Sequence, residues 1–212
     1  MALALAGVLG GAVGVWQVVG VDGSSRPPAA ALPIDGWPAA GESRAVTEVR
    51  ADGDLEVTHW IHSDLPLDEV GLTLPDLDGA VQIAAADVEV VADGRTAAGP
   101  RVVPAGGSSY SFAEATRIQV RYRLTGAVER SSSADGRGLA TTTSLDVTAT
   151  QARDVRVVRS QEVLSLACAA PDRRPTPCGT SGGVSGGTDQ WRVELTGDDP
   201  VDRVLAVVTI PS

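Results

Sequence analysis

The pattern of hydrophobic and polar positions divides this chain into two parts. The first charged residue is Asp22, and residues 2–21 before it are uncharged and mostly apolar. A run of this length can cross the ~30 Å hydrocarbon core of a bilayer as one helix. We therefore predict a single transmembrane helix over residues 1–21, with a different kind of structure after it.

The alternative for this apolar segment is a cleaved signal peptide. Such a peptide usually has a basic N-terminal region, a shorter apolar core and a small-x-small cleavage site. No Lys or Arg precedes the run, and Ala29–Ala31 directly follows Pro28. These features favour a retained anchor. The spacing of Gly10 and Gly14 would also permit close packing against another helix.

Residues 22–42 are predicted to form an extended linker. They are rich in Pro, Gly, Ser and Ala, a composition typical of spacers that hold a domain away from a surface. Trp37 within this segment could anchor at the membrane interface or pack under the following domain, and the sequence allows both.

From Ser43 to residue 212 the polar and apolar residues alternate over short segments. A period of two is typical of β-strands, and no long 3.6-residue period follows residue 42. Many short strands predict an all-β fold, most simply an antiparallel β-sandwich. Only Val81–Val91 would also suit a short helix. The expected strands are Arg44–Arg50, Leu55–Ile61, Val70–Pro75, Val81–Val91, Ser109–Phe112, Arg117–Thr125, Leu139–Val147, Val155–Val158, Val163–Cys168, Gln190–Leu195 and Arg203–Ile210.

A pattern of strand, acidic-proline turn, strand and proline occurs twice, at residues 55–75 and 191–211. It predicts two related β-halves, although chance repetition explains it equally well. The first copy, with Leu65-Pro66-Leu67 before Val70–Pro75, resembles the core of Ig-like modules of bacterial surface proteins over about twenty residues. Those modules usually carry Asn in the break, where this chain has His62-Ser63-Asp64. The resemblance implies an Ig-like sandwich displayed at a surface, and it transfers no catalytic residue.

Composition narrows the classes of function. The net charge of −10 disfavours binding to nucleic acid, because phosphate contacts need clustered cations. All 17 cationic side chains are Arg, which indicates GC-rich codon usage of the actinobacterial type. Aromatic residues make up 3% of the chain, so a base-stacking or sugar-stacking platform is not expected.

The two cysteines indicate an exported domain. Cys168 and Cys178 flank a turn-rich segment with three prolines, which suits a local disulfide formed in an oxidising compartment. In the chain-entropy model such a short loop stabilises a fold by roughly 2–3 kcal/mol.

The residues that could carry chemistry do not converge on a site. His59 and His62 fall on opposite faces of one strand, so a zinc site is not expected, and His59 is predicted to be half-buried with its hydrogen bonds satisfied. The acidic residues fit solvated turns better than a calcium loop. Ser181–Gly187 is predicted to be a flexible loop, because no helix or lysine follows it to bind phosphate. No metal and no cofactor are therefore expected.

One strand carries a row of cations. In Arg117–Leu124 the alternate residues Arg117, Gln119, Arg121 and Arg123 line the face opposite the apolar positions. Such a row could bind an anionic polymer or an acidic partner. The alternative is cross-strand pairing with carboxylates. Arg117, Arg121 and Arg123 are the candidate binding residues.

These observations predict a non-catalytic interaction or assembly module of the bacterial cell envelope. A single helix would place residues 43–212 on the extracytoplasmic side of the cell membrane, where an envelope protein or an anionic polymer would be the partner. The alternatives are an accessory subunit of a membrane complex and an envelope hydrolase without a recognisable motif.

Overall fold

The computed structural model describes residues 36–75, 83–142, 145–149, 151–171, 173–185, 187–197, 201 and 203–210. All regular secondary structure in these residues is β-strand. None of the described segments forms a helix that is long and apolar enough to cross a membrane. The helix predicted over residues 1–21, and the linker up to residue 35, lie outside the described residues.

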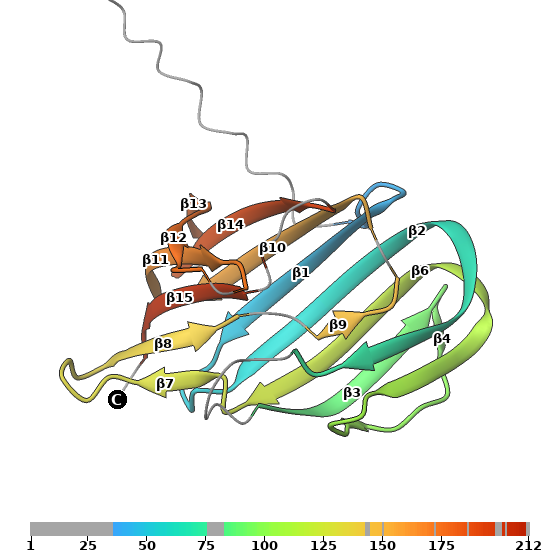
Figure 1. The fold of residues 1–212 in the computed structure, drawn as a ribbon, viewed down its shortest axis with the longest axis horizontal. Coiled ribbons are helices and arrows are strands. Elements are labelled where there is room, and N and C mark those ends of the chain that lie inside the picture. Colours follow the sequence, from blue (N-terminus) through green and yellow to red (C-terminus); the bar gives the residue numbers. More distant parts are fainter. Residues whose placement is uncertain are drawn as a thin grey trace, which may run out of the picture. The chain divides into compact units, whose positions relative to one another are not determined.

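The larger of two sheets has ten strands, and all of its strand pairs are antiparallel except β1–β10 (Figure 1). Its main path runs in the order β13 (Thr180–Ser185), β14 (Thr188–Thr196), β10 (Arg153–Ser160), β1 (Glu42–Val49), β2 (Leu55–Thr73), β6 (Ser108–Thr125), β3 (Ala84–Ala92) and β4 (Arg95–Thr96). Two short strands lie off this path: β5 (Val102–Val103) pairs with β3, and β9 (Asp146–Val147) pairs with β2.

The smaller sheet has five strands, all paired antiparallel. Its order is β12 (Thr176–Pro177), β11 (Glu162–Ala169), β15 (Arg203–Thr209), β8 (Arg137–Thr141) and β7 (Val128–Arg130). Figure 1 shows these strands across one end of the larger sheet.

One hydrophobic core joins the two sheets, because strand alternation turns the apolar side chains of each sheet toward the other. The larger sheet contributes Leu55, Val57, Ile61, Ile118, Val120 and Leu124, and the smaller sheet contributes Val163, Leu166, Val204, Ala206 and Val208. All of them are at most 3% exposed. The prediction of an all-β fold with antiparallel sheets is confirmed.

Two pairs of predicted strands are each one long strand. Leu55–Ile61 and Val70–Pro75 belong to β2, and Ser109–Phe112 and Arg117–Thr125 belong to β6. The two long strands pair with each other, and register shifts between His62 and Glu69 absorb the residues that looked like a turn. Bulges of this kind allow a strand to continue past a local break.

Three further predictions need correction. Ser181–Gly187 is not simply a loop: Thr180–Ser185 form β13, since backbone pairing with β14 does not depend on large side chains. The predicted strand Leu139–Val147 is divided between β8 and β9, which pair with different strands. The segment Val81–Val91 contributes to β3, so its alternative as a helix is wrong over Ala84–Val91.

The sequence repeat does not correspond to a repeat of the fold. In the first copy, residues 55–73 form the single strand β2. In the second copy, β14 belongs to the ten-stranded sheet and β15 to the five-stranded sheet. The two copies therefore differ in their place in the architecture.

Candidate functional site

The predicted cationic row lies on the face of the ten-stranded sheet that is turned away from the core, which we call the outer face. Over residues 117–124 of β6 the buried residues are Ile118, Val120, Tyr122 and Leu124, all at most 4% exposed. Alternation places Arg117, Arg121 and Arg123 between them on the outer face, as predicted. The three arginines have different surroundings.

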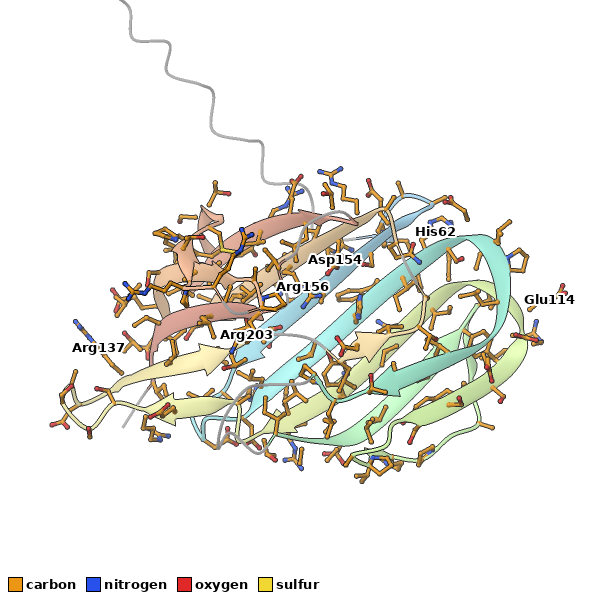
Figure 2. All side chains as sticks on the ribbon, viewed as in Figure 1. His62, Glu114, Arg137, Asp154, Arg156 and Arg203 are labelled. Carbon is orange, nitrogen blue, oxygen red and sulfur yellow. A yellow bond between two sulfur atoms is a disulfide. The ribbon has the colours of Figure 1, made fainter. Side chains whose placement is uncertain are left out.

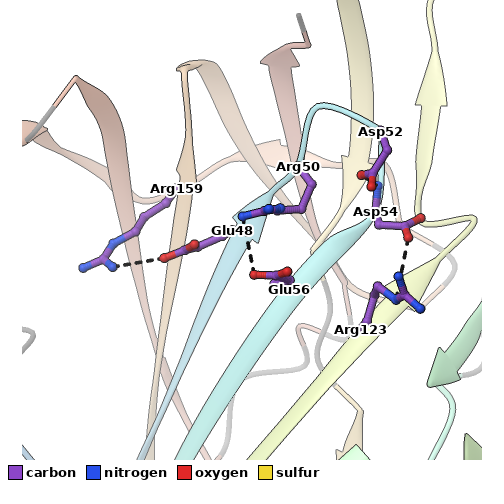
Figure 3. A network of polar contacts seen from close by, with 7 residues as sticks. All are labelled: Glu48, Arg50, Asp52, Asp54, Glu56, Arg123 and Arg159. Atoms are coloured by element: carbon purple, nitrogen blue, oxygen red, sulfur yellow. Dashed lines mark hydrogen bonds and ion pairs between the residues drawn. The ribbon is translucent and has the colours of Figure 1, made fainter. Parts of the chain in front are cut away.

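Arg123 is paired with carboxylates (Figure 3). Its Nε atom lies 3.8 Å from Asp54, in the turn before β2, and its terminal nitrogen lies 3.0 Å from Asp87 of β3. Asp87 has a left-handed φ of 55° and also lies 3.8 Å from Arg101. Arg123 therefore fits the alternative that the sequence offered, which is pairing with carboxylates of neighbouring segments.

Arg117 stacks on an aromatic ring from the predicted linker. Its guanidinium lies 5.9 Å from the centre of the Trp37 ring. The next residue, Pro38, has its carbonyl oxygen 2.8 Å from Nδ1 of His62 on β2. Trp37 is 38% exposed and contacts the domain through Arg117, while its predicted role at a membrane interface stays a prediction. The last residues of the predicted linker thus contact the sheet ahead of Ser43.

Arg121 is exposed, and it lies opposite Thr58 of β2 and Glu89 of β3. It makes no ion pair with any part of the chain that the structure describes. Among the three candidates, Arg123 alone makes an ion pair within the described residues, and Arg117 contacts the Trp37 ring instead.

Elsewhere on the outer face, arginines alternate with carboxylates across the strands. Arg159 lies 3.4 Å from Glu48, and Arg50 lies 3.6 Å from Glu56 (Figure 3). Arg153 bridges Glu42 and Glu194, and hydrogen bonds to Glu194 and Glu42 raise the pKa of Arg153. The outer face is thus a lattice of opposite charges rather than a continuous cationic row. A binding role for Arg117, Arg121 and Arg123 stays a prediction.

The face of the same sheet that is turned toward the core carries a polar cluster, formed by Ser43, His59, Asp154 and Arg156. The Ser43 hydroxyl donates to Oδ1 of Asp154 at 2.7 Å, and Nε of Arg156 donates to Oδ2 at 2.5 Å. The Asp154 and Arg156 side chains are each 19% exposed. Figure 2 labels both on β10. The small residue Ala45 lies between Arg156 and His59 in the register and leaves room for both side chains.

His59 is 5% exposed, and neither ring nitrogen has a hydrogen-bond partner in the described part of the chain. Burial lowers the pKa of His59 to about 4, although the nearby Asp154 charge opposes this shift. The imidazole is therefore neutral near pH 7. The predicted burial of His59 is correct in direction, but the prediction that its hydrogen bonds are satisfied is wrong.

Asp154 remains ionised despite its surroundings. Burial raises the pKa of a carboxyl group, but Arg156, His59 and the Ser43 hydroxyl all lower it, and the net shift of the Asp154 pKa is downward. The half-buried pair is thus a carboxylate and a guanidinium, with the neutral imidazole of His59 beside them.

The cluster brings Ser, His and Asp together, but not as a catalytic triad. In a triad the serine hydroxyl donates to the histidine, and the aspartate holds the other ring nitrogen. Here the Ser43 hydroxyl donates to Asp154 instead, and both nitrogens of His59 lack hydrogen bonds within the described residues. Ser43 is also 4% exposed. This arrangement fits a structural role rather than an activated nucleophile.

The two histidines do not converge, as predicted. His59 lies on the core side of β2, while His62 lies on the outer face beside Pro38. Among the described residues no group of three His, Cys, Asp or Glu side chains is placed to hold a metal ion.

The predicted disulfide between Cys168 and Cys178 is present, with the two Cα atoms 5.6 Å apart. It closes the hairpin of β11 and β12. Cys168 is 7% exposed and belongs to the core, whereas Arg173 and Arg174 at the hairpin tip are exposed. The bond therefore fixes an exposed basic tip to the buried end of the smaller sheet.

The half-buried ion pair of Asp154 and Arg156 was not predicted. Its signal was present in the sequence, because two opposite charges that stand two residues apart on a strand share one face. The predicted strand, Val155–Val158, contained Arg156 but left out Asp154.

Part of the fold is similar to regions of known peptidase structures. An aminopeptidase N family protein from Idiomarina loihiensis matches with a TM-score of 0.50 and 12% identity, over 78% of this chain and 29% of that protein. An M1 zinc metallopeptidase from Deinococcus radiodurans gives a TM-score of 0.42 and 13% identity, over 78% of this chain and 41% of that one. This chain therefore spans less than half the length of either. At such identities the first likeness concerns the fold alone. No protein family model and no curated protein sequence matches the chain.

Proposed function

We propose that this chain is a membrane-anchored, extracytoplasmic interaction module of a bacterial cell envelope, without a catalytic role of its own. The observation that carries the proposal is the Cys168–Cys178 disulfide, which closes a hairpin of the domain. Disulfides of this kind form and persist in oxidising compartments outside the cytosol. The apolar segment 1–21 supplies the anchor in this proposal.

The domain itself is proposed to act as a display scaffold of the Ig-like sandwich type. Two sheets that share one core support this proposal. The similar region makes up 29% of the Idiomarina loihiensis protein, which supports use of such a fold as one part of a larger assembly. The peptidase activity in that protein's name is not transferred, because 12% identity supports a common fold and nothing finer.

The partner is proposed to be an envelope protein or an anionic polymer. On the outer face, Arg121 offers a charge that the described chain leaves unpaired, next to the paired Arg123. A surface on which opposite charges alternate fits a partner with a complementary charge pattern better than it fits a uniformly charged partner. Nucleic acid is disfavoured by the net charge of −10.

A pull-down from native membranes tests the proposal. The full chain and a chain that begins at Gly36, which keeps the contacts of Trp37 and Pro38, are purified in mild detergent, and co-purifying proteins are identified by mass spectrometry. Capture of the same partner by both forms is expected. Capture by the full chain alone would instead favour the accessory-subunit alternative, and capture by neither would contradict the proposal.

A charge reversal sharpens this test. Arg121→Glu is expected to weaken capture if the outer face binds an acidic partner. Arg95→Glu is the matched control, because Arg95 is also exposed, lies on the edge strand β4 and makes no ion pair within the described residues. Equal loss with both variants would indicate an effect of net charge rather than of the face.

A further inference from the structure

The edge strands of the two sheets differ in how open they are to another strand. In the described part of the chain, β4, β5 and β9 are each two residues long, β7 carries Glu129 and Arg130, and β12 contains Pro177. Short length, charge and proline are the usual devices that prevent addition of a strand to an edge. The remaining edge strand, β13, has six residues with no charge and no proline.

The backbone of β13 is accessible from its outer side. The strand pairs with β14, and no described segment pairs with its other edge. Val184 is 73% exposed, and a β-carbon added at Gly183 would meet no atom within 4 Å. A register shift between Ser181 and Gly183 interrupts the first half of the strand, whereas Gly183–Ser185 pair in regular steps with β14.

The orientation of the backbone groups follows from the hairpin. Two residues separate Ser185 from Thr188, which face each other in the register. Two-residue hairpin loops are closed by a hydrogen-bonded pair, and the next pair is not hydrogen-bonded. The next pair here is Val184 with Asp189. We therefore expect the N–H and C=O of Val184 to point away from β14.

A basic tip lies close to β13 in the sequence. Arg173 and Arg174 are exposed at the tip of the disulfide-closed hairpin, and only Cys178 and Gly179 separate β12 from β13. Neither arginine makes an ion pair with the residues that the structure describes. Five arginines on the ten-stranded sheet do make such pairs: Arg123, Arg153, Arg156, Arg159 and Arg192.

We propose that an extended, acidic segment of a partner polypeptide adds to β13 as a further strand of the ten-stranded sheet. Backbone hydrogen bonds to the N–H and C=O of Val184 would supply affinity, and carboxylates that reach Arg173 and Arg174 would supply selectivity. The inference rests on the proposed function and names how the module takes its partner. Charge complementarity favours an acidic partner over a second copy, because the copy would carry the same basic tip.

The first experiment uses a defined probe. A fluorescein-labelled peptide with two Glu followed by alternating Thr and Val is titrated into the full chain in detergent, and a peptide with two Lys in place of the Glu serves as its control. Fluorescence anisotropy should show binding of the acidic peptide and at least tenfold weaker binding of the basic one. Amide hydrogen exchange should slow at Val184 when the acidic peptide is bound.

Two sets of variants separate the backbone contribution from the charge contribution. Val184→Pro removes the outward donor and should abolish binding, while Val184→Thr should keep it. Arg173→Glu with Arg174→Glu should weaken binding about tenfold at low salt, since two attractions become repulsions. Arg95→Glu with Arg137→Glu changes the net charge equally at exposed sites on β4 and β8 and should leave binding unchanged.

The inference would be overturned by absence of binding of the acidic peptide, by equal binding of both peptides, or by exchange protection away from β13. If Val184→Pro does not fold, the tip variants and the exchange pattern still decide the matter. Self-association of the wild type that Val184→Pro removes would point to a second copy instead. Capture of a native partner equally by Val184→Pro and the wild type would leave the module proposal standing and refute the β13 inference.

Discussion

The two faces of the ten-stranded sheet carry the same kinds of charged pairs in different surroundings. On the outer face, Arg159 and Glu48 lie 3.4 Å apart, with side chains that are 29% and 46% exposed. On the core side, Arg156 and Asp154 lie 2.5 Å apart, each 19% exposed, beside the buried His59. We therefore expect a similar contact to be nearly neutral to stability on the outer face and much more important on the core side.

Water accounts for the difference. On the outer face it solvates each charge whether or not the pair forms, so such a pair contributes about 0–1 kcal/mol. In the cluster, both charges have lost much of their water, so each depends on its partner. The Ser43 hydroxyl adds a hydrogen bond to Asp154, which offsets part of the desolvation. Loss of one charged residue therefore leaves the other without its counter-charge.

The largest effect is expected from Asp154→Ala. It leaves the Arg156 guanidinium mostly buried without its carboxylate, and it removes the acceptor of the Ser43 hydroxyl. We expect a loss of about 3–5 kcal/mol in the free energy of unfolding. Urea unfolding followed by tryptophan fluorescence at pH 7.5 measures it. A loss below 1 kcal/mol would remove the contrast between the two faces.

The next effect is a pH dependence from His59. Its pKa is about 4 in the folded chain and 6.5 as the ordinary value, so protonation favours the unfolded chain. The stabilising contribution is complete above pH 6.5 and is lost as the pH falls toward 4. From pH 7.5 to pH 5 the loss should be about 2 kcal/mol, at 1.36 kcal/mol per pKa unit.

A pair of variants assigns this pH dependence. His59→Leu should flatten the stability profile between pH 7.5 and pH 5, whereas His62→Gln should keep it, because His62 lies on the outer face. Asp154 does not interfere in this range. Its pKa is lowered, so its contribution is lost only as the pH falls below the ordinary Asp value near 3.8. Persistence of the slope in His59→Leu would place the titrating group elsewhere.

A smaller effect is expected when both charges are replaced together. Asp154→Leu with Arg156→Met removes the ion pair and leaves neither charge without its partner. Such replacements of buried pairs are often neutral or stabilising by about 1–4 kcal/mol. We expect the double variant to be at least as stable as the wild type, in contrast to Asp154→Ala. Chemical denaturation of the two variants side by side provides the comparison.

The sequence predicted the outer face better than the cluster, and the reason is physical. Alternation depends on neighbouring residues alone, so the opposite directions of Arg121 and Ile118 could be inferred from β6 itself. The disulfide of Cys168 and Cys178 is also a local feature. The pairing of β1 with β10 joins residues that are 111 positions apart, such as Ser43 and Asp154. No local pattern encodes such a parallel contact.

Local sequence signals also gave wrong predictions where pairing with a neighbouring strand determined the structure. The glycines near Gly183 have low strand propensity, yet β14 supplies a partner and the segment becomes β13. The break near Pro66 looked like a turn, yet pairing with β6 carries β2 past it through register shifts. The missing hydrogen bonds of His59 could not be inferred either, since they depend on how the second sheet closes the core.

The smallest effect is expected for Glu48→Gln on the outer face. It removes the charge partner of Arg159 but keeps a side chain of similar size, and Arg159 retains a 3.3 Å hydrogen bond to Gln190. The free energy of unfolding should fall by no more than about 0.5 kcal/mol in low salt, and the difference from the wild type should shrink further at 1 M salt, where the Debye length is about 3 Å. Salt should change the much larger effect of Asp154→Ala less, because partly buried charges are screened less than exposed ones. A salt-sensitive loss of several kcal/mol in Glu48→Gln would mean that the outer lattice acts as one cooperative network rather than as separate, solvated pairs.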